Sequence, residues 1–474
     1  MEFVTLVAGL LLPWLCGSAL MLALRSARTP LAAPGEIAWL CGTGYLVGAF
    51  VLTLWMRALS SGGIAFGVLV IAAPLAAATA LAMAVAGRRH GRDLVSAPVA
   101  ALRALAATPG LTGAMRTVWW AALGWLAFRY ALLAAEVALR PLYPWDAWIQ
   151  WATKARVWYE LGGVTPFARA HEWLAAGGSV YFDASPEYPP TMPLLQVWSC
   201  LLVGRWDDVM MNWPWWQIAV ALPLVAYGAL RNAGAGAPSA LAGAFLVATL
   251  PLANVHVALA GYADLPMAAY YAAAALALLR WGASRDARDA VLALVLAVAC
   301  TQIKTPGFFW ALTLVPGAIV VFAPSRGPRV VAAGFGAMLL VLFALASQQA
   351  TIFNYRLNLD FDPATLALAQ SFFALGNWHI LWYGAVVATL LARRRLLGPA
   401  LAPLTMIVAG GAIFLLVVFS FSNARDWVDN QTSINRAVLH IAPLIAVFTV
   451  LAYRAFASRW REWCDGTPSR PQPG

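Results

Sequence analysis

The chain has 474 residues, of which 62% are hydrophobic and only 11% are charged. A soluble domain carries about 25% charged residues, so a chain of this composition has too few to cover a water-facing surface. The composition excludes a soluble enzyme, a disordered protein and a fibrous protein. It predicts an all-α polytopic membrane protein.

The net charge of +11 arises from 31 basic and 20 acidic residues. Most basic residues fall in short gaps between apolar runs and do not cluster on one soluble face. This is the pattern of membrane topology, so we expect a lipid bilayer as partner and no nucleic acid. The five cysteines are far apart and have no metal-ligand spacing.

Apolar runs along the chain predict about 13 transmembrane helices, because about 20 apolar residues cross the hydrocarbon core. The runs cover 3–24, 37–57, 64–86, 116–139, 214–230, 238–256, 262–280, 288–302, 308–322, 330–350, 378–392, 400–420 and 436–454. The two short runs around Lys304-Thr-Pro-Gly307 would form two short helices or one broken pair.

Alternation of these spans collects most arginines on one side and most acidic residues on the other. By the positive-inside rule the arginine-rich side is cytoplasmic. We therefore expect a multi-pass protein of the cytoplasmic (inner) membrane with its N-terminus outside and its C-terminus in the cytoplasm. Its polar candidates then lie on the periplasmic, extracytoplasmic face.

The spans divide the chain into three predicted segments. Residues 1–115 would form a three-helix membrane extension with a cytoplasmic amphipathic connector, residues 116–454 a transmembrane module, and residues 455–474 a cytoplasmic tail. The outer loop 140–213 is the longest non-spanning region. Its apolar run 191–203 is too short to span comfortably, which predicts a re-entrant or interfacial helix.

The outer loop opens with a carboxylate held at the membrane surface. Pro144 suits a helix start, which places Asp146 near the first turn, where it would act as a cap or as a functional group. Four aromatic residues then share roughly one helix face, which predicts an interfacial helix with its aromatic side in the lipid headgroups. They are Trp148, Trp151, Trp158 and Tyr159.

Further polar candidates follow on the same side. His171 lies in the loop, and the prolines of 189–193 stiffen the chain so that Glu187 and Tyr188 are fixed near the interface, unless this segment is a plain turn. Asp264 begins a span, where a carboxylate is a natural cap.

Cationic candidates come from two later segments. Lys304 lies between apolar runs beside a Pro-Gly break, whose free backbone N–H groups would suit a phosphate; the alternative is a lysine that extends to the interface. Arg436 enters the last span from outside, with His440 one turn deeper on the same face. His440 would be a ligand-binding or a hydrogen-bonded core histidine, and Arg425 precedes both.

A metal has one weak candidate. Asp360-Phe-Asp362 places two carboxylates at a spacing that could bind a divalent cation. A single Asp-x-Asp motif, however, is more typical of a solvated loop. No cofactor follows with certainty from the sequence.

These motifs together resemble the GT-C superfamily of integral-membrane glycosyltransferases, in particular the bacterial branch similar to protein O-mannosyltransferases and the aminoarabinose transferase of lipid A. The resemblance covers roughly 116–454. It is carried by Trp145-Asp146-Ala-Trp148, Tyr188-Pro-Pro190, Gly261-Tyr-Ala-Asp264-Leu-Pro266, Lys304-Thr-Pro-Gly307 and Asn435-Arg436-Ala-Val-Leu-His440. The chain departs from the pattern in its three extra N-terminal spans, its single early Asp and its Tyr-Pro-Pro in place of His-Pro-Pro.

The resemblance implies transfer of a sugar from a polyprenyl-phosphate donor to a hydroxyl of a glycan, lipid or protein acceptor. Asp146 would be the general base of an inverting displacement. The phosphate leaving group would bind Lys304, Arg436 and Arg425. Glu187, Tyr188, His171, Asp264 and His440 would bind substrate.

Two other classes fit the composition. A transporter or flippase of envelope precursors would also have many spans and intramembrane charges, but it should show pseudo-symmetric halves and a midplane site. A scaffold in envelope assembly would need no reactive constellation. The gathering of polar residues on the outer side favours the transferase.

Overall fold

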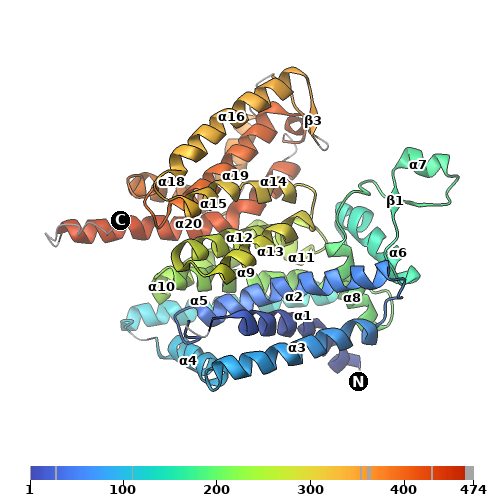
Figure 1. Ribbon diagram of the computed structural model, residues 1–474, viewed down its shortest axis with the longest axis horizontal. Coiled ribbons are helices and arrows are strands. Elements are labelled where there is room, and N and C mark those ends of the chain that lie inside the picture. Colours follow the sequence, from blue (N-terminus) through green and yellow to red (C-terminus); the bar gives the residue numbers. More distant parts are fainter. Residues whose placement is uncertain are drawn as a thin grey trace.

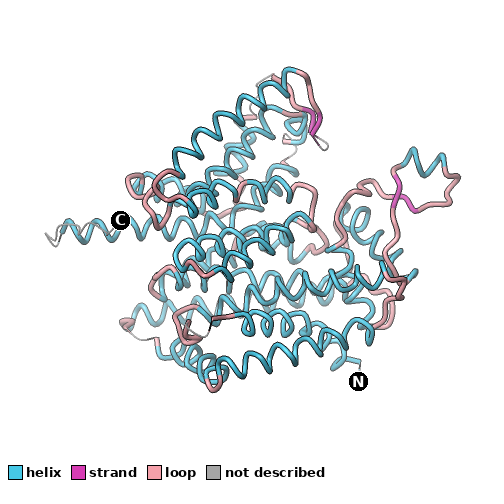
Figure 2. Tube along the Cα trace, viewed as in Figure 1, coloured by secondary structure: helices cyan, strands magenta, loops and turns pink. Residues whose placement is uncertain are grey.

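The computed structural model describes residues 2–26, 29–108, 110–352, 355–359, 364–428 and 431–464, which form a bundle of helices with two small sheets (Figures 1 and 2). The helices are α1 (Glu2–Leu24), α2 (Glu36–Ser61), α3 (Val68–His90), α4 (Asp93–Ala107), α5 (Gly113–Leu139), η1 (Ala147–Ala152), α6 (Thr153–Leu161), α7 (Ala170–Ala175), α8 (Thr191–Val203), η2 (Met210–Asn212), α9 (Trp213–Asn232), α10 (Ala237–Ala248), α11 (Pro251–Ala258), α12 (Asp264–Ser284), α13 (Ala287–Thr301), α14 (Gly307–Leu312), α15 (Val315–Phe322), α16 (Gly327–Ser347), α17 (Thr365–Ala369), η3 (Gln370–Ala374), α18 (Leu381–Ala392), α19 (Ala402–Phe421), η4 (Asn423–Trp427) and α20 (Thr432–Cys464). The strands β1 (Phe167–Ala168) and β2 (Tyr181–Phe182) pair in parallel, and β3 (Thr351–Ile352) and β4 (Tyr355–Arg356) pair antiparallel.

Seven helices of the described chain are long and apolar enough to cross a membrane, and the pair α10–α11, bent by 52°, would make an eighth. The seven lie in α1, α2, α3, α5, α16, α19 and α20. A multi-pass all-α membrane protein is therefore confirmed. The thirteen predicted spans are not, because several of the predicted runs form helices such as α13 and α18, which have only 15 and 12 residues.

The outer helices present large apolar side chains away from the protein. Leu69 and Leu81 of α3 are 80% and 69% exposed, and Leu340 of α16 is 73% exposed. Contiguous exposed apolar surface of this kind is rare on soluble monomers and marks contact with lipid or a partner. Together with helix length, it places these faces against the bilayer.

Helix α12 lies at the centre and is buried along Asp264–Leu278. It packs against α9, α13 and α20. Its many alanines allow this close packing, and its tyrosines find partners in neighbouring helices. The hydroxyl of Tyr270 donates to Leu46 O at 2.6 Å, and that of Tyr271 lies 2.7 Å from Thr313 Oγ1.

The outer loop departs from its prediction. Trp151 and Trp158 are buried in the protein, so a single aromatic face in the lipid headgroups is wrong. Trp151 stacks on Tyr188, while the indole of Trp158 donates to Thr165 O at 2.9 Å. The run 191–203 forms α8, and it is buried against α1, α2 and α6, not spread on the interface.

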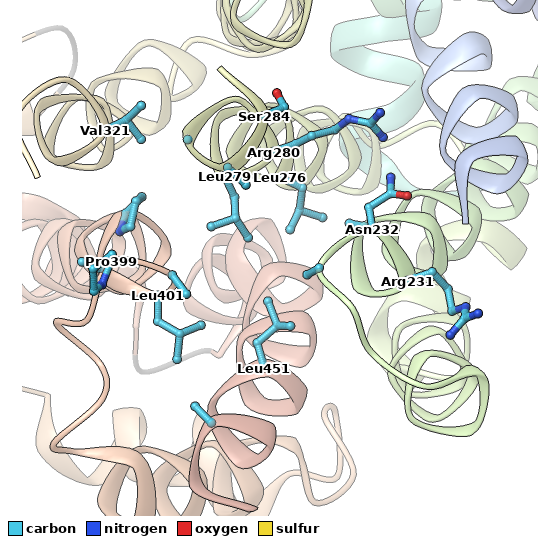
Figure 3. A pocket seen from close by; sticks show the side chains of 18 of the residues that line it. Arg231, Asn232, Leu276, Leu279, Arg280, Ser284, Val321, Pro399, Leu401 and Leu451 are labelled. Carbon is cyan, nitrogen blue, oxygen red and sulfur yellow. The ribbon is translucent and has the colours of Figure 1, made fainter. Parts of the chain in front are cut away.

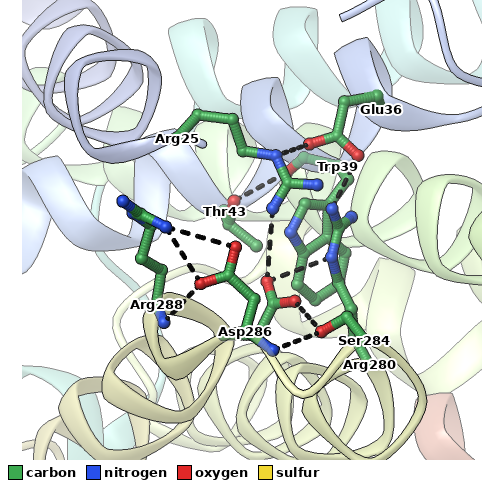
Figure 4. Close-up of polar contacts among 9 residues, drawn as sticks. Arg25, Glu36, Trp39, Thr43, Arg280, Ser284, Asp286 and Arg288 are labelled. Carbon is green, nitrogen blue, oxygen red and sulfur yellow. Dashed lines mark hydrogen bonds and ion pairs between the residues drawn. The ribbon is translucent and has the colours of Figure 1, made fainter. Parts of the chain in front are cut away.

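A buried ion-pair network joins one end of α12 to α2, α13 and the residue after α1 (Figure 4). Glu36 lies 2.7 Å from both Arg25 Nε and Arg280 Nη2, and Asp289 lies 3.0 Å from Arg280 Nε. All four side chains are at most 11% exposed. We call this set the Glu36 network.

The ends of the bundle differ in the segments they carry. Helix α1 begins on the same side of Figure 1 as the projecting lobe with α7 and β1, whereas α20 ends on the opposite side. The start of α1 and the end of α20 therefore lie on different sides of the bundle. Which end faces the cytoplasm rests on the arginine distribution.

Candidate functional site

The site is built around the buried carboxylate of Asp264, the first residue of α12. Its Oδ1 accepts hydrogen bonds from Lys304 Nζ at 2.7 Å and His440 Nε2 at 2.9 Å, and its Oδ2 accepts one from Arg436 Nε at 2.8 Å. The side chain is fully buried. The side chain of Asp264 is therefore not a helix cap, and Lys304 has a buried carboxylate as its partner.

Arg436 connects this buried centre to the surface. Its Nη1 donates to Asp146 Oδ2 at 2.5 Å, while its guanidinium lies 4.4 Å from the ring centroid of Tyr262, a cation–π contact. The side chains of Arg436 and Asp146 are 22% and 27% exposed. We call Asp146, Asp264, Lys304, Arg436 and His440 the Asp264 network; its outer pair is within reach of a ligand.

Two glycines explain how distant segments meet here. Gly261 has φ +112°, and a Cβ there would lie 2.5 Å from Ala147 Cβ, so only glycine lets η1 pack on the start of α12. A Cβ on Gly307 would lie 2.0 Å from Cys300 O, so the turn after α13 closes tightly. That turn holds Lys304 beside Asp264.

The predicted free backbone donors at the Lys304 break are wrong. The N–H of Gly307 donates to Lys304 O at 2.8 Å, and that of Phe308 donates to Thr305 O at 3.2 Å. The turn thus satisfies two of the N–H groups that were expected to bind a phosphate, so these two are not available to an anion.

The network is balanced in charge. Two carboxylates, Asp146 and Asp264, face the cations Lys304 and Arg436, and His440 is buried edge-on to Trp310. Buried ion pairs gain little net stability but are costly to break, because a lone buried charge remains. The arrangement is therefore specific, and each member fixes the others.

Tyr188 lies at the edge of the Asp264 network. Its ring stacks on Trp151 with a centroid distance of 5.0 Å and an interplanar angle of 20°. Burial raises the pKa of Tyr188; the carboxylates of Asp264 and Asp146 raise it further and Arg436 lowers it. The phenol is therefore within the electrostatic field of the network and keeps its proton.

The loop that carries Tyr188 is held by a lysine that the sequence did not single out as a site residue. Lys154 Nζ donates to Ser185 O at 2.6 Å and lies 3.7 Å from Asp183 Oδ1, with both charged side chains buried. Burial is the main cause that lowers the pKa of Lys154 and raises that of Asp183. A lysine inside an aromatic helix was the available signal.

Other predicted site residues lie apart. His171 is exposed on α7 in the projecting lobe (Figure 1), and Glu187 lies 3.5 Å from Arg169. Arg425 is half-buried in η4, which contacts α20. Asp360 and Asp362 lie outside the described residues, and within the described part no group of three metal-ligating side chains occurs.

Tyr262 is a site residue that the sequence motif contained but the reasoning missed. Besides its contact with Arg436, its ring lies 5.2 Å from the buried ring of His256. Its carbonyl accepts a hydrogen bond from Trp215 Nε1 at 2.6 Å, which fixes the turn before α12. The signal was its place in Gly261-Tyr-Ala-Asp264.

Comparison with protein-family models, with curated proteins and with solved structures found no match for this chain. These comparisons therefore assign the chain to no family. The function has to be argued from the geometry of the Asp264 network and from its place at one end of a membrane bundle.

Proposed function

We propose that the chain is a GT-C-like integral-membrane glycosyltransferase that moves a sugar from a polyprenyl-phosphate donor to an acceptor hydroxyl. The observation that supports this most is the partly exposed Asp146–Arg436 pair on a buried charge network. A carboxylate can take a proton, and a guanidinium binds phosphate through two parallel hydrogen bonds. The proton acceptor and the phosphate-binding cation that the reaction needs are thus in contact.

In the proposed reaction Asp146 accepts the proton of the acceptor hydroxyl as its oxygen attacks the anomeric carbon. The bond between that carbon and the phosphate oxygen breaks, and the polyprenyl phosphate leaves with the electron pair. A single displacement inverts the configuration. Arg436 stabilises the leaving phosphate, and Lys304 adds positive potential beneath it.

Donor binding would exchange partners on Arg436. Its Nε bonds to the buried Asp264, which Lys304 and His440 hold in place, so the guanidinium keeps its position. Its Nη1 bonds to Asp146. A phosphate that takes over this nitrogen would release the Asp146 carboxylate to act as base, so that the base becomes available when the donor is present.

The setting completes the proposal. We place the site on the extracytoplasmic face of the cytoplasmic membrane, within a module of residues 116–454. This module would hold ten of the thirteen predicted spans and would follow a three-helix extension. Tyr188 is then a substrate-side group, His440 holds Asp264 from the buried side, and Glu187, His171 and Arg425 belong to the surrounding outer segments. The acceptor would be a glycan, a lipid or a protein.

A transporter or flippase of envelope precursors is the second candidate. The observation that favours it is that α12 carries buried ion pairs at both ends, one in the Asp264 network and one in the Glu36 network. Ion pairs at the two ends of a central helix would suit two gates of an alternating-access protein.

The test is sugar transfer in membranes from a panel of radiolabelled polyprenyl-phosphate sugars. Wild type should transfer label from at least one donor, whereas Asp146→Asn should lose about 100-fold or more, the usual contribution of a general base. Glu160→Gln is the matched control, because Glu160 is an exposed outer carboxylate paired with Arg156 at 2.9 Å. It should transfer normally.

Two results would contradict the proposal. Equal transfer by Asp146→Asn and wild type would remove Asp146 as base. No transfer with any donor, together with solute movement by the purified protein in liposomes, would establish the transporter.

A further inference from the structure

A cavity of about 1350 Å³ opens at the end of the bundle opposite the Asp264 network (Figure 3). The final turns of α9, α12 and α15, the loop before α19 and the later part of α20 surround it. Helix α12 has 21 residues, or about 30 Å at about 1.5 Å per residue, so the cavity is a separate site from the one at Asp264.

Arginines dominate the charged part of the lining. The cavity is lined by Arg25, Arg231, Arg280, Arg285, Arg395 and Arg454. Among its described lining residues the one carboxylate is Glu36, which pairs with Arg25 and Arg280. Asp289 pairs with the same two arginines. The carboxylates of the Glu36 network thus face two of the six lining arginines, Arg25 and Arg280.

Three of these arginines are anchored to backbone carbonyl oxygens. Arg454 Nη2 donates to Gly234 O at 2.6 Å. Arg231 Nη1 donates to Ala235 O at 2.5 Å, and Arg285 Nη1 donates to Val321 O at 2.6 Å. A guanidinium has five N–H donors, so one anchored nitrogen leaves others for an anion. Anchoring also reduces the conformational entropy lost when an anion binds.

Apolar side chains form the remaining wall. Leu276, Leu279, Leu401 and Leu451 line the same cavity as the arginines. Figure 3 shows these leucines facing one another, with the guanidinium groups of Arg231 and Arg280 pointing away from them at the edge of the cavity. A soluble anion would not contact such an apolar wall, whereas a lipid would contact the arginines with its headgroup and the leucines with its chains. Basic pockets between transmembrane helices on the cytoplasmic side bind anionic lipid headgroups, and the arginine distribution predicts that side here.

We propose that this cavity binds the phosphate-bearing headgroup of an anionic membrane lipid, with Arg231 and Arg285 as phosphate ligands and the leucines against its chains. The inference does not depend on the transferase proposed above, since it uses no residue of the Asp264 network.

The test is native mass spectrometry of the purified full-length protein with phosphatidylglycerol, with phosphatidylcholine and with inorganic phosphate. Wild type should bind phosphatidylglycerol at least ten-fold more tightly than phosphatidylcholine. The variant R231Q/R285Q should lose this preference. The control R88Q/R116Q removes two exposed arginines of α3 and α5 that do not line the cavity, and it should behave as wild type.

Three results would overturn the proposal. They are equal binding of the two lipids by wild type, an equal loss of preference in both double variants, and inorganic phosphate that binds as tightly as phosphatidylglycerol and displaces it. The last result would identify a soluble phosphate ligand. If R231Q/R285Q fails to fold by thermal unfolding, Arg285→Gln alone provides the same comparison, because Arg285 is exposed at the end of α12.

Discussion

At one end of α12 the carboxylate of Asp264 holds Lys304, Arg436 and His440, while at the other end Arg280 is held between Glu36 and Asp289. Each network combines two carboxylates with two cations. Each also places an arginine over an aromatic ring, Tyr262 in the first and Trp39 in the second. The two ends thus use the same interactions.

Their access differs. In the Glu36 network every paired side chain is at most 11% exposed, whereas the Asp264 network ends in Arg436 and Asp146, which are 22% and 27% exposed. The closed network joins helices, and the side chains that it turns to the cavity already have partners. An open one joins helices and also offers a base and a cation to a ligand. Buried charge alone is therefore weak evidence of function, and a graded exit to the surface is stronger evidence.

The largest expected effect comes from removing the central carboxylate of each network. Asp264→Asn removes the carboxylate that Lys304 and Arg436 share, and Glu36→Gln removes one of the two carboxylates that Arg25 and Arg280 share. Each change leaves an excess of positive charge in a largely buried network, so each should lower the free energy of unfolding by up to about 3–5 kcal/mol. Thermal unfolding of the purified proteins measures this. Transfer per folded molecule should be lost in Asp264→Asn and kept in Glu36→Gln.

The comparison between the ends fails if Glu36→Gln loses transfer to the same degree. Unchanged stability in Asp264→Asn would show instead that Asp264 is not the centre of its network.

A smaller effect is expected when an arginine of each network is replaced by lysine, which keeps the charge but has fewer hydrogen-bond donors. In Arg436→Lys one ammonium nitrogen replaces the two guanidinium nitrogens that separately bond Asp264 and Asp146, so at least one of the two hydrogen bonds should weaken. The loss of a charged hydrogen bond, about 1.5–3 kcal/mol, corresponds to about a 10- to 100-fold drop in kcat/KM for the donor. Arg280→Lys is the control at the other end and should leave transfer unchanged. A normal kcat/KM in Arg436→Lys would show that the planar guanidinium of Arg436 is not needed for the reaction.

Sequence reasoning found the members of the Asp264 network singly, but it could not find their contacts. Residue type and position in a span singled out Lys304, Arg436 and His440. The bond from Arg436 to Asp264 joins residues 172 positions apart, which no local pattern encodes. At a helix start the default partner of a carboxylate is the backbone, so Asp264 was interpreted as a cap.

The same limit explains the errors in the outer loop. Helical spacing predicts which aromatic residues share a face, but not whether lipid or protein covers that face, so Trp151 was placed in the headgroups although it stacks on Tyr188. Apolar run length located α1, α2, α3 and α5 within a few residues of their ends. The arginine cavity was hidden because topology counting uses Arg231 and Arg285 only as markers of a side.

The smallest expected effect tests how far the open network extends. Tyr188→Phe keeps the stacking on Trp151 and removes one hydroxyl, so unfolding should be unchanged and kcat/KM should fall about 2- to 10-fold, the value of about 0.5–1.5 kcal/mol for one hydrogen bond. Because burial raises the pKa of Tyr188 above its ordinary value of 10.0, the phenol keeps its proton throughout neutral and mildly alkaline pH.

The ratio of wild type to Tyr188→Phe should therefore stay constant from about pH 6 to about pH 9, below the usual tyrosine pKa of about 10. Tyr143→Phe, at a tyrosine of the same loop that is 72% exposed, is the matched control and should match wild type. A ratio that falls toward 1 at the alkaline end would mean that the Tyr188 hydroxyl loses its proton there. Tyr188 would then be more solvated than its burial indicates. A constant ratio of 1 would show that the Tyr188 hydroxyl does not contribute to transfer and that the functional network extends no further than Asp146.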